Sequence, residues 1–230
     1  MRVLHRVGRG TGLNRPGDAS AWDAMFASGT YDLTRESPLL VGLLSRAGRA
    51  GAFLDLGCGL GRNLAAFPGP GPVVGVDASA RALSGARTRP GALCVRALMT
   101  RLPFRDASFG TVLAWRSLYL QDAAGIRATV AEILRVLAPG GVLVCSLRSE
   151  ENLLARHARA HGLAVSPGTW VLPDPPFSGA TYHFLPEPEL REIFSGFILT
   201  DLRREELSHT ALTRNLPGKN EFWVFTAKKP

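Results

Sequence analysis

The sequence predicts an α/β protein whose doubly wound, seven-stranded sheet is mostly parallel and has an antiparallel last strand. Short apolar runs alternate with helical stretches between Ala52 and Leu147, which is typical of a parallel sheet covered on both faces. The runs are almost wholly apolar, as strands buried on both faces are. The link between the last two runs, 203–220, shows no apolar helical stripe, so these two strands are expected to pair antiparallel.

The first five predicted strands share a short length and an apolar composition: AFLDL (52–56), VVGVD (73–77), a weaker run at 92–95, TVLAW (111–115) and VLVCSL (142–147). The clearest helix lies between the fourth and fifth of them. Its apolar residues recur at helical spacing: Ile126, Val130, Ile133, Leu134 and Leu137. Asp122 is placed to cap its start, and Pro139-Gly140-Gly141 is expected to end it.

After the fifth strand the pattern changes. We expect a helix over 150–161, a loop rich in proline and glycine over 162–181, and a short helix over 188–195. Two strands complete the chain, at 197–202 and 221–227.

The composition is that of a globular domain. Among 230 residues, 46% are hydrophobic and 20% are charged, which excludes the disordered class. No apolar run approaches the ~18 residues of a membrane helix, so no membrane partner is expected. Cys58, Cys94 and Cys145 stand far apart and suit neither a disulfide framework nor a metal site, so a reducing compartment, the cytoplasm, is predicted.

Basic residues outnumber acidic ones, 27 to 19, and 24 of them are arginines, which gives a net charge of +8. Residues 1–20 are predicted to form a disordered basic arm, because several glycines and a proline break any helix there; a transit-like segment is the alternative. Residues 21–230 are predicted to form a single domain.

The most informative segment is DLGCGLGRN (55–63), directly after the first strand. Its three glycines let backbone approach a ligand, and open α/β sheets bind ligands at this end of the first strand. Asp77 ends the second strand, 20 residues after Gly57, where a carboxylate can accept both hydroxyls of a ribose. Arg62 replaces the third glycine of the GxGxxG fingerprint and no GK[ST] follows, which favours a nucleoside without phosphates. A tight turn that binds nothing is the plain alternative.

Four segments together resemble the class I S-adenosylmethionine-dependent methyltransferases: DLGCGLGRN, VVGVD, RLPFRDASFGTVLAW and RVLAPGGVLV. The resemblance covers 52–147 closely and the EFWVFTA strand loosely, while the GCGxGRN variant and the tail from Tyr182 to Thr210 resemble the tellurite-resistance-like and small-molecule branch. It implies a Rossmann-like fold, S-adenosylmethionine as methyl donor with S-adenosylhomocysteine as product, and an acceptor-side insertion at 148–182.

The resemblance also implies a set of cofactor-binding residues. Asp55 would hold the amino group and Asp77 the ribose, the loop glycines would lie against the methionine part, and the fourth strand would end beneath the sulfonium and the carboxylate. The residues beside the adenine would come from the ends of the second and third strands. In chain order the set is Asp55, Gly57, Cys58, Gly59, Arg62, Asp77, Ala78, Leu98, Met99, Trp115 and Arg116.

Three positions depart from the family pattern. Leu98 stands where many relatives carry an Asp for the adenine amino group, Gly110 replaces the usual Asp after Ser-Phe, and Tyr119 stands where many have His. No general base is therefore identified, and Tyr119 and His183 are the candidates.

The acceptor-site candidates are aromatic and histidine residues from three parts of the chain: the N-terminal segment, the stretch after the fourth strand, and residues 157–183. They are Trp22, Tyr31, Tyr119, His157, Tyr182 and His183. Trp22, Phe26 and Tyr31 would close over the cofactor; alternatively, they belong to an amphipathic helix that packs on the core. His157 and His161 form an i, i+4 pair without an acidic companion, so a solvated helix face is expected and no metal.

The predicted function is in-line transfer of a methyl group from S-adenosylmethionine to a small molecule. Two alternatives stay open: an RNA methyltransferase, motivated by the net charge, and a catalytically silent cofactor-binding protein, motivated by the missing Asp and base. Against the first, the fourth strand ends in Ala114-Trp115-Arg116-Ser117 rather than [DN]PP[YF], and the arginines are spread along the chain. A nucleic-acid partner is thus not expected, whereas Arg116 and Arg148 could set the charge of the acceptor pocket. The acceptor and the oligomeric state are not predicted.

Overall fold

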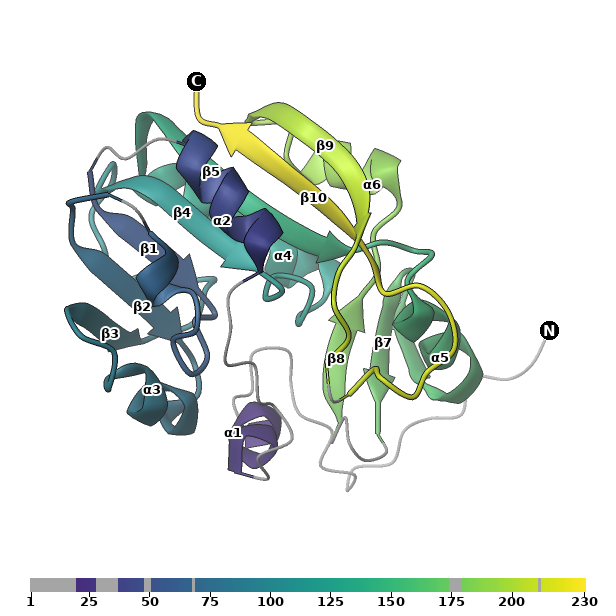
Figure 1. The fold of residues 1–230 in the computed structure, drawn as a ribbon. Helices are drawn as coiled ribbons and strands as arrows, with labels where there is room; N and C mark the ends of the chain where they lie inside the picture. Colours follow the sequence, from purple (N-terminus) through teal and green to yellow (C-terminus); the bar gives the residue numbers. More distant parts are fainter. Residues whose placement is uncertain (1–19, 28–36, 48–50, 68, 174–178, 211) are drawn as a thin grey trace.

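The computed structural model describes residues 20–27, 37–47, 51–67, 69–173, 179–210 and 212–230. The predicted basic arm, apart from Ser20, and Tyr31 therefore lie outside the described residues. Seven strands form the main sheet, in the order β3-β2-β1-β4-β5-β10-β9 (Figure 1). Their bounds are β1 Phe53–Leu56, β2 Val73–Asp77, β3 Ala92–Arg96, β4 Phe109–Trp115, β5 Leu137–Arg148, β9 Ile198–Glu206 and β10 Glu221–Lys228.

The sheet confirms the predicted α/β architecture. Strands β3, β2, β1, β4 and β5 run parallel to one another, and β10 pairs antiparallel with both β5 and β9. The strand order reverses between β1 and β4, and an open α/β sheet binds ligands at such a switch point. The fold thus places the loop after β1 where a ligand is expected.

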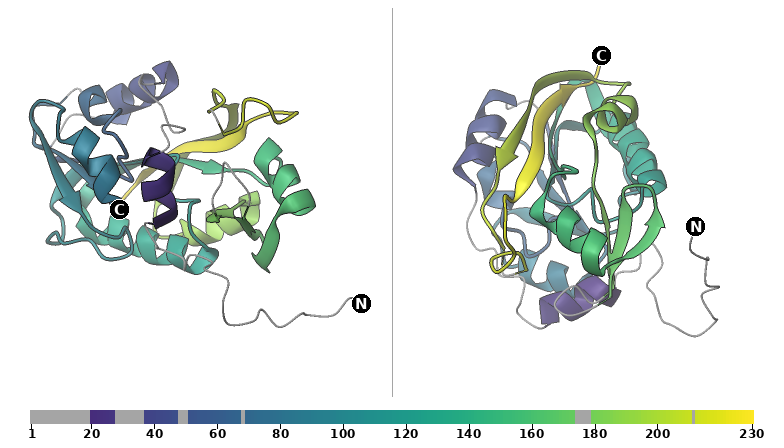
Figure 2. Two further views of the ribbon diagram at one scale, coloured as in Figure 1. Left: turned by 90° about the horizontal axis from the view of Figure 1, so that it is seen from below. Right: turned by 90° about the vertical axis from the view of Figure 1, so that its right-hand side faces the viewer.

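Helices cover both faces of this sheet. Helix α2 (Pro38–Ala47) lies on one face and α4 (Ala123–Val136) on the other (Figures 1 and 2). Asp122 caps α4 as predicted, since its carboxylate accepts a hydrogen bond of 2.8 Å from the amide of Gly125. The smaller helical elements are α3 (Ala80–Ala86), α6 (Glu187–Ile193) and the 3₁₀ helix η1 (Leu64–Ala66).

The prediction of a loop over 162–181 is wrong. Strands β6 (Leu163–Ser166), β7 (Thr169–Leu172) and β8 (Ala180–His183) form a separate antiparallel sheet in this stretch. The prolines and glycines that indicated a loop lie between the strands. Gly168, with a φ of 71°, turns the chain between β6 and β7.

Pro139-Gly140-Gly141 also behaves differently from the prediction. Helix α4 ends at Val136, and β5 begins at once, because Leu137 already pairs with Phe109 of β4. The Pro-Gly-Gly segment is therefore an irregularity within β5 rather than the turn before it.

Two helices and the three-stranded sheet flank the carboxyl ends of the parallel strands. Helix α1 (Ser20–Ala27) lies there beside α3, while α5 (Leu153–His161) and the three-stranded sheet lie toward β10 (Figure 1). None of the helices among the described residues has the length and apolar character needed to cross a membrane.

Candidate functional site

The loop after β1 folds back onto the end of β2. The amides of Gly57 and Cys58 both donate to the carbonyl of Val76, at 2.7 and 3.0 Å. Gly57, Gly59 and Gly61 have φ values of 70°, 55° and 78°, in the left-handed region that favours glycine. Backbone rather than side chains therefore lines this turn.

Gly57 has no room for a side chain. A Cβ built there would lie 2.5 Å from the Cβ of Ser117 and 2.8 Å from the Cε of Met99. Ser117 is itself held, since its hydroxyl donates to the carbonyl of Leu56 at 2.7 Å. The glycine thus lets the segment after β4 pack directly against the loop.

We expect Gly57→Ala to lower the free energy of unfolding by about 2–4 kcal/mol, because it combines left-handed backbone strain with steric overlap. Urea unfolding measures the change. Gly91→Ala is the matched control, because Gly91 has a φ of 73° but nothing within 4 Å of its added Cβ. An equal loss in both variants would contradict the close packing at Gly57.

Asp77, at the end of β2, organises the loop through both carboxylate oxygens. Oδ2 accepts from the amide of Gly59 and Oδ1 from that of Ser79, each at 2.9 Å. Burial nevertheless raises the pKa of Asp77, and these backbone hydrogen bonds oppose the shift. Each oxygen keeps a lone pair with which it can accept a ligand hydroxyl.

Asp55 lies in β1, one strand away, and is only 1% exposed. Its Oδ2 atom is buried and has no hydrogen-bond partner among the described residues. Burial raises the pKa of Asp55 to about 7, Arg62 opposes the shift and Asp77 adds to it. A buried carboxylate oxygen without a partner is suited to bind a cationic group of a ligand.

Three further residues predicted to bind the cofactor are Cys58 in the loop, Ala78 after β2 and Leu98 after β3. Cys58 is buried, and its Sγ would lie 2.9 Å from a Cβ added to Gly75 in β2, so the thiol faces the sheet. Burial raises the pKa of this thiol well above its usual range. The carbonyl of Ala78 accepts from Nε of Arg96 at 3.1 Å, and Leu98 is 46% exposed.

Helix α1 lies over the loop. A carboxylate oxygen of Asp23 accepts a hydrogen bond from the hydroxyl of Ser79 and one of 3.3 Å from the amide of Arg81, at the start of α3. Phe26 lies 3.4 Å from a Cβ added to Gly59. Trp22 packs on the hydrophobic core. The helix therefore combines the two roles that the sequence left open, covering the loop and packing on the core.

We expect Asp23→Ala to weaken the binding of S-adenosylhomocysteine about 3- to 10-fold, because the helix over the loop loses hydrogen bonds that hold it to α3. Asp23→Asn should retain most of the affinity, because an amide oxygen can still accept. Calorimetric titration of the three proteins checks this, and equal affinities would exclude a covering role for α1.

The last two predicted cofactor residues, Trp115 and Arg116, follow each other at the end of β4. Trp115 is buried in the core at the end of β4. Arg116 adopts a φ of 61°, and its Nη2 donates to the carbonyl of Ser208 at 2.8 Å. Its guanidinium lies 5.3 Å from the ring centroid of Phe222.

Two of the predicted acceptor residues meet. The rings of Tyr119 and Tyr182 stack with centroids 6.5 Å apart, and the guanidinium of Arg148 lies 4.9 Å from the ring of Tyr119. The backbone joins the same elements, since the amide of His183 donates to the carbonyl of Tyr119 at 2.9 Å. The insertion is thereby fixed to the segment after β4.

His183, at the end of β8, is engaged by neighbouring side chains. Its side chain is fully buried, with Nδ1 2.8 Å from the hydroxyl of Thr169 and Nε2 3.2 Å from Glu189. Burial lowers the pKa of His183, against the raising effect of Glu189. Neither ring nitrogen is directed to a ligand in this arrangement.

His157 lies on α5 away from the loop. Its ring centroid is 4.7 Å from that of His161, and both residues line a pocket of about 330 Å³ together with Leu216, Pro217 and Gly218. No group of three or more potential metal ligands gathers within the part of the chain that the structure describes.

The sequence did not single out several residues of the site: Asp23, Ser79, Ser117, Asn152, Ser208 and Asn220. Ser79 and Asn152 carried a local signal, because each is placed to cap the helix that follows it. Asp23, Ser117, Ser208 and Asn220 act through contacts between distant segments.

Comparisons with known proteins agree with this geometry. Residues 53–141 match the family model described as a methyltransferase domain. A curated demethylmenaquinone methyltransferase from Symbiobacterium thermophilum is 36% identical over 104 residues, which cover 40% of this chain and 40% of that protein. The chain thus matches about two fifths of the length of this relative.

Solved structures match over more of the chain. A SAM-dependent methyltransferase from Methanosarcina mazei has a TM-score of 0.69 and 24% identity, covering 85% of this chain and 98% of that one. An N1-methyltransferase from Burkholderia thailandensis, solved with 1,6-didemethyltoxoflavin and S-adenosylhomocysteine, has a TM-score of 0.64 and 20% identity and covers 98% of both chains. These likenesses show the Rossmann-like methyltransferase fold.

Proposed function

We propose that this chain is an S-adenosylmethionine-dependent methyltransferase that acts on a small-molecule acceptor. The observation that carries the proposal is the pair of carboxylates at the ends of neighbouring strands, Asp55 and Asp77, on either side of the glycine-rich loop. The matching family model over 53–141 supports the same activity.

The residues present fit the cofactor. The orphaned Oδ2 of Asp55 can bind a protonated amino group, Asp77 can accept the ribose hydroxyls, and the backbone of the loop at Gly57 and Gly59 can lie against the methionine part. Ala78, Leu98 and Met99 would flank the adenine. When bound, S-adenosylmethionine supplies a methyl group that its sulfonium already activates for displacement.

The chain itself contributes binding, orientation and the exclusion of water. The candidate bases are held elsewhere: His183 by Thr169 and Glu189, and Tyr119 between Arg148 and Tyr182. We therefore expect an acceptor that does not depend on a base of the protein, such as a thiolate, an amine or a soft anion.

A small acceptor is favoured over RNA. Five arginines of the described residues pair with carboxylates, so part of the positive charge is neutralised within the protein: Arg127, Arg135, Arg191, Arg203 and Arg204. The structural relative with bound 1,6-didemethyltoxoflavin also supports a small acceptor. The tellurite-resistance-like branch and the cytoplasmic location stay predictions from the sequence.

Incubation with S-adenosylmethionine labelled in its methyl group tests the proposal. We expect label in one or more members of a panel of small thiols, amines, hydroxyl compounds and carboxylates, and none in total RNA. Label in RNA alone would support the RNA alternative. Binding of the cofactor without transfer to any acceptor would support the silent cofactor-binding protein.

A further inference from the structure

We infer that the acceptor carries a carboxylate, and that this group binds to the Nε–Nη2 edge of Arg148. The inference rests on the proposed function, because it assigns an acceptor to that site. It starts from a buried cation, Arg148, which is only 4% exposed at the end of β5.

The protein uses one side of this guanidinium only. Nη1 donates to Oδ1 of Asn152 at 2.7 Å and to Oδ1 of Asn220 at 3.0 Å. Nε is buried and has no hydrogen-bond partner among the described residues. The Nε–Nη2 edge is the one that binds a carboxylate with two parallel hydrogen bonds.

No carboxylate of the described residues forms an ion pair with Arg148; the ion pairs among these residues lie on other arginines and on His183. The oxygens that Nη1 contacts belong to neutral amides. The rings of Tyr119 and Phe222, 4.9 and 4.8 Å away, stabilise the cation only in part. A buried guanidinium is costly without an anion, and a bound carboxylate would supply it.

A second arginine adds to the positive charge. Arg116 is 5% exposed and lies over the same ring of Phe222 as Arg148. Both arginines are positioned by one network, because Asn220 donates to the carbonyl of Ser208 at 3.0 Å and Arg116 donates to that carbonyl too. Two like charges on one ring raise the affinity of this region for an anion.

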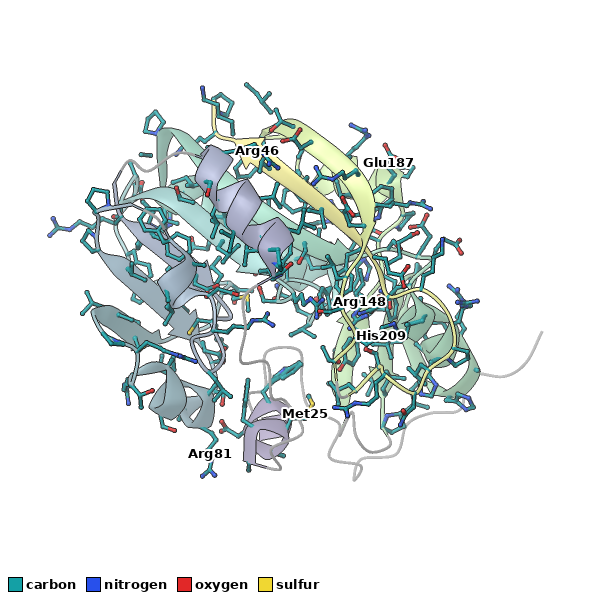
Figure 3. All side chains as sticks on the ribbon, viewed as in Figure 1. Met25, Arg46, Arg81, Arg148, Glu187 and His209 are labelled. Atoms are coloured by element: carbon teal, nitrogen blue, oxygen red, sulfur yellow. The ribbon has the colours of Figure 1, made fainter. Side chains whose placement is uncertain are left out.

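The position fits the acceptor side of the site. Arg148 follows the segment of β5 that pairs with β4, and Ser117, next to Arg116, packs against the cofactor loop at Gly57. Figure 3 shows Arg148 at the carboxyl end of the sheet, on the side of α5 and the three-stranded sheet. The methionine part of the cofactor also has a carboxylate, so the experiment must separate the two sources.

Benzoate and benzamide form a matched pair of probes with equal shape and different charge. Their binding to the full-length protein is measured by ligand-observed NMR, with and without saturating S-adenosylhomocysteine. We expect the wild type to prefer benzoate by about 10-fold or more, as a charge-assisted bidentate contact provides. Arg148→Met should remove the preference and Arg148→Lys should retain part of it, while both bind S-adenosylhomocysteine within about 2-fold of wild type. Arg89→Met, at an exposed arginine, is the control.

Equal binding of benzoate and benzamide to the wild type would overturn the inference, and this comparison needs no variant. A preference that survives in Arg148→Met would also overturn it. If Arg148→Met instead weakens S-adenosylhomocysteine more than about 10-fold, Arg148 serves the cofactor carboxylate and the acceptor assignment is wrong. A preference for benzoate that depends on Arg148, in a protein that does not bind S-adenosylhomocysteine, would support the anion site and refute the proposed function.

Discussion

Asp77→Asn is expected to weaken the binding of S-adenosylhomocysteine about 100-fold, and methyl transfer with it. The carboxylate accepts from the amides of Gly59 and Ser79, and we propose that it also accepts the ribose hydroxyls. An amide keeps the shape but presents a donor where an acceptor is required, so at least one backbone amide or hydroxyl loses its partner.

Asp201→Asn is the control for this change, because Asp201 is exposed on β9 and an asparagine tolerates its φ of 54°. Calorimetric titration gives both affinities. If Asp77→Asn binds within about 3-fold of wild type, Asp77 does not hold the ribose.

Asp55→Asn is expected to make the protein without cofactor more stable at pH 8 by about 2–4 kcal/mol. In the folded state the pKa of Asp55 is raised to about 7 from 3.8, mainly by burial. A raised carboxylate pKa contributes stability below the unfolded value, and this contribution is lost as the pH rises through 7. The unfolding free energy of the wild type should therefore fall relative to that of the variant between pH 5 and pH 8.

Urea unfolding at both pH values measures this difference, again with Asp201→Asn as the control. Parallel pH dependences for wild type and Asp55→Asn would show that Asp55 is ionised without penalty. The same variant should bind S-adenosylhomocysteine weakly at every pH, whereas the wild type should lose affinity by about tenfold per unit below pH 7, because the protonated carboxyl no longer binds an ammonium group.

The sequence predicted the features that depend on local patterns. The strands β1 to β5 could be found because each is a short apolar run, and the capping role of Asp122 followed from its place before a helical repeat. The loop after β1 was identified from its glycines, from its place after the first apolar run and from Asp77, 20 residues after Gly57. The positive φ values of the glycines and the overlap at Gly57 give the physical reason for the glycine pattern.

The remaining features depend on pairing between distant segments. β6 lies on the exposed edge of its sheet, so its residues did not show the buried pattern of a strand. Asp23 and Ser79 are 56 positions apart, and Arg148 meets Asn220 over 72. Such contacts leave no trace in the spacing of residues, and the network around Arg148 could be seen only in the structure.

The central claim is that the carboxylate pair and the loop bind S-adenosylmethionine. Isothermal titration of the full-length protein with S-adenosylhomocysteine tests it most directly. The account predicts saturable binding of one ligand per chain, which Asp77→Asn weakens strongly and Asp201→Asn leaves unchanged. Absence of binding to the folded wild type, or equal binding by both variants, would contradict it.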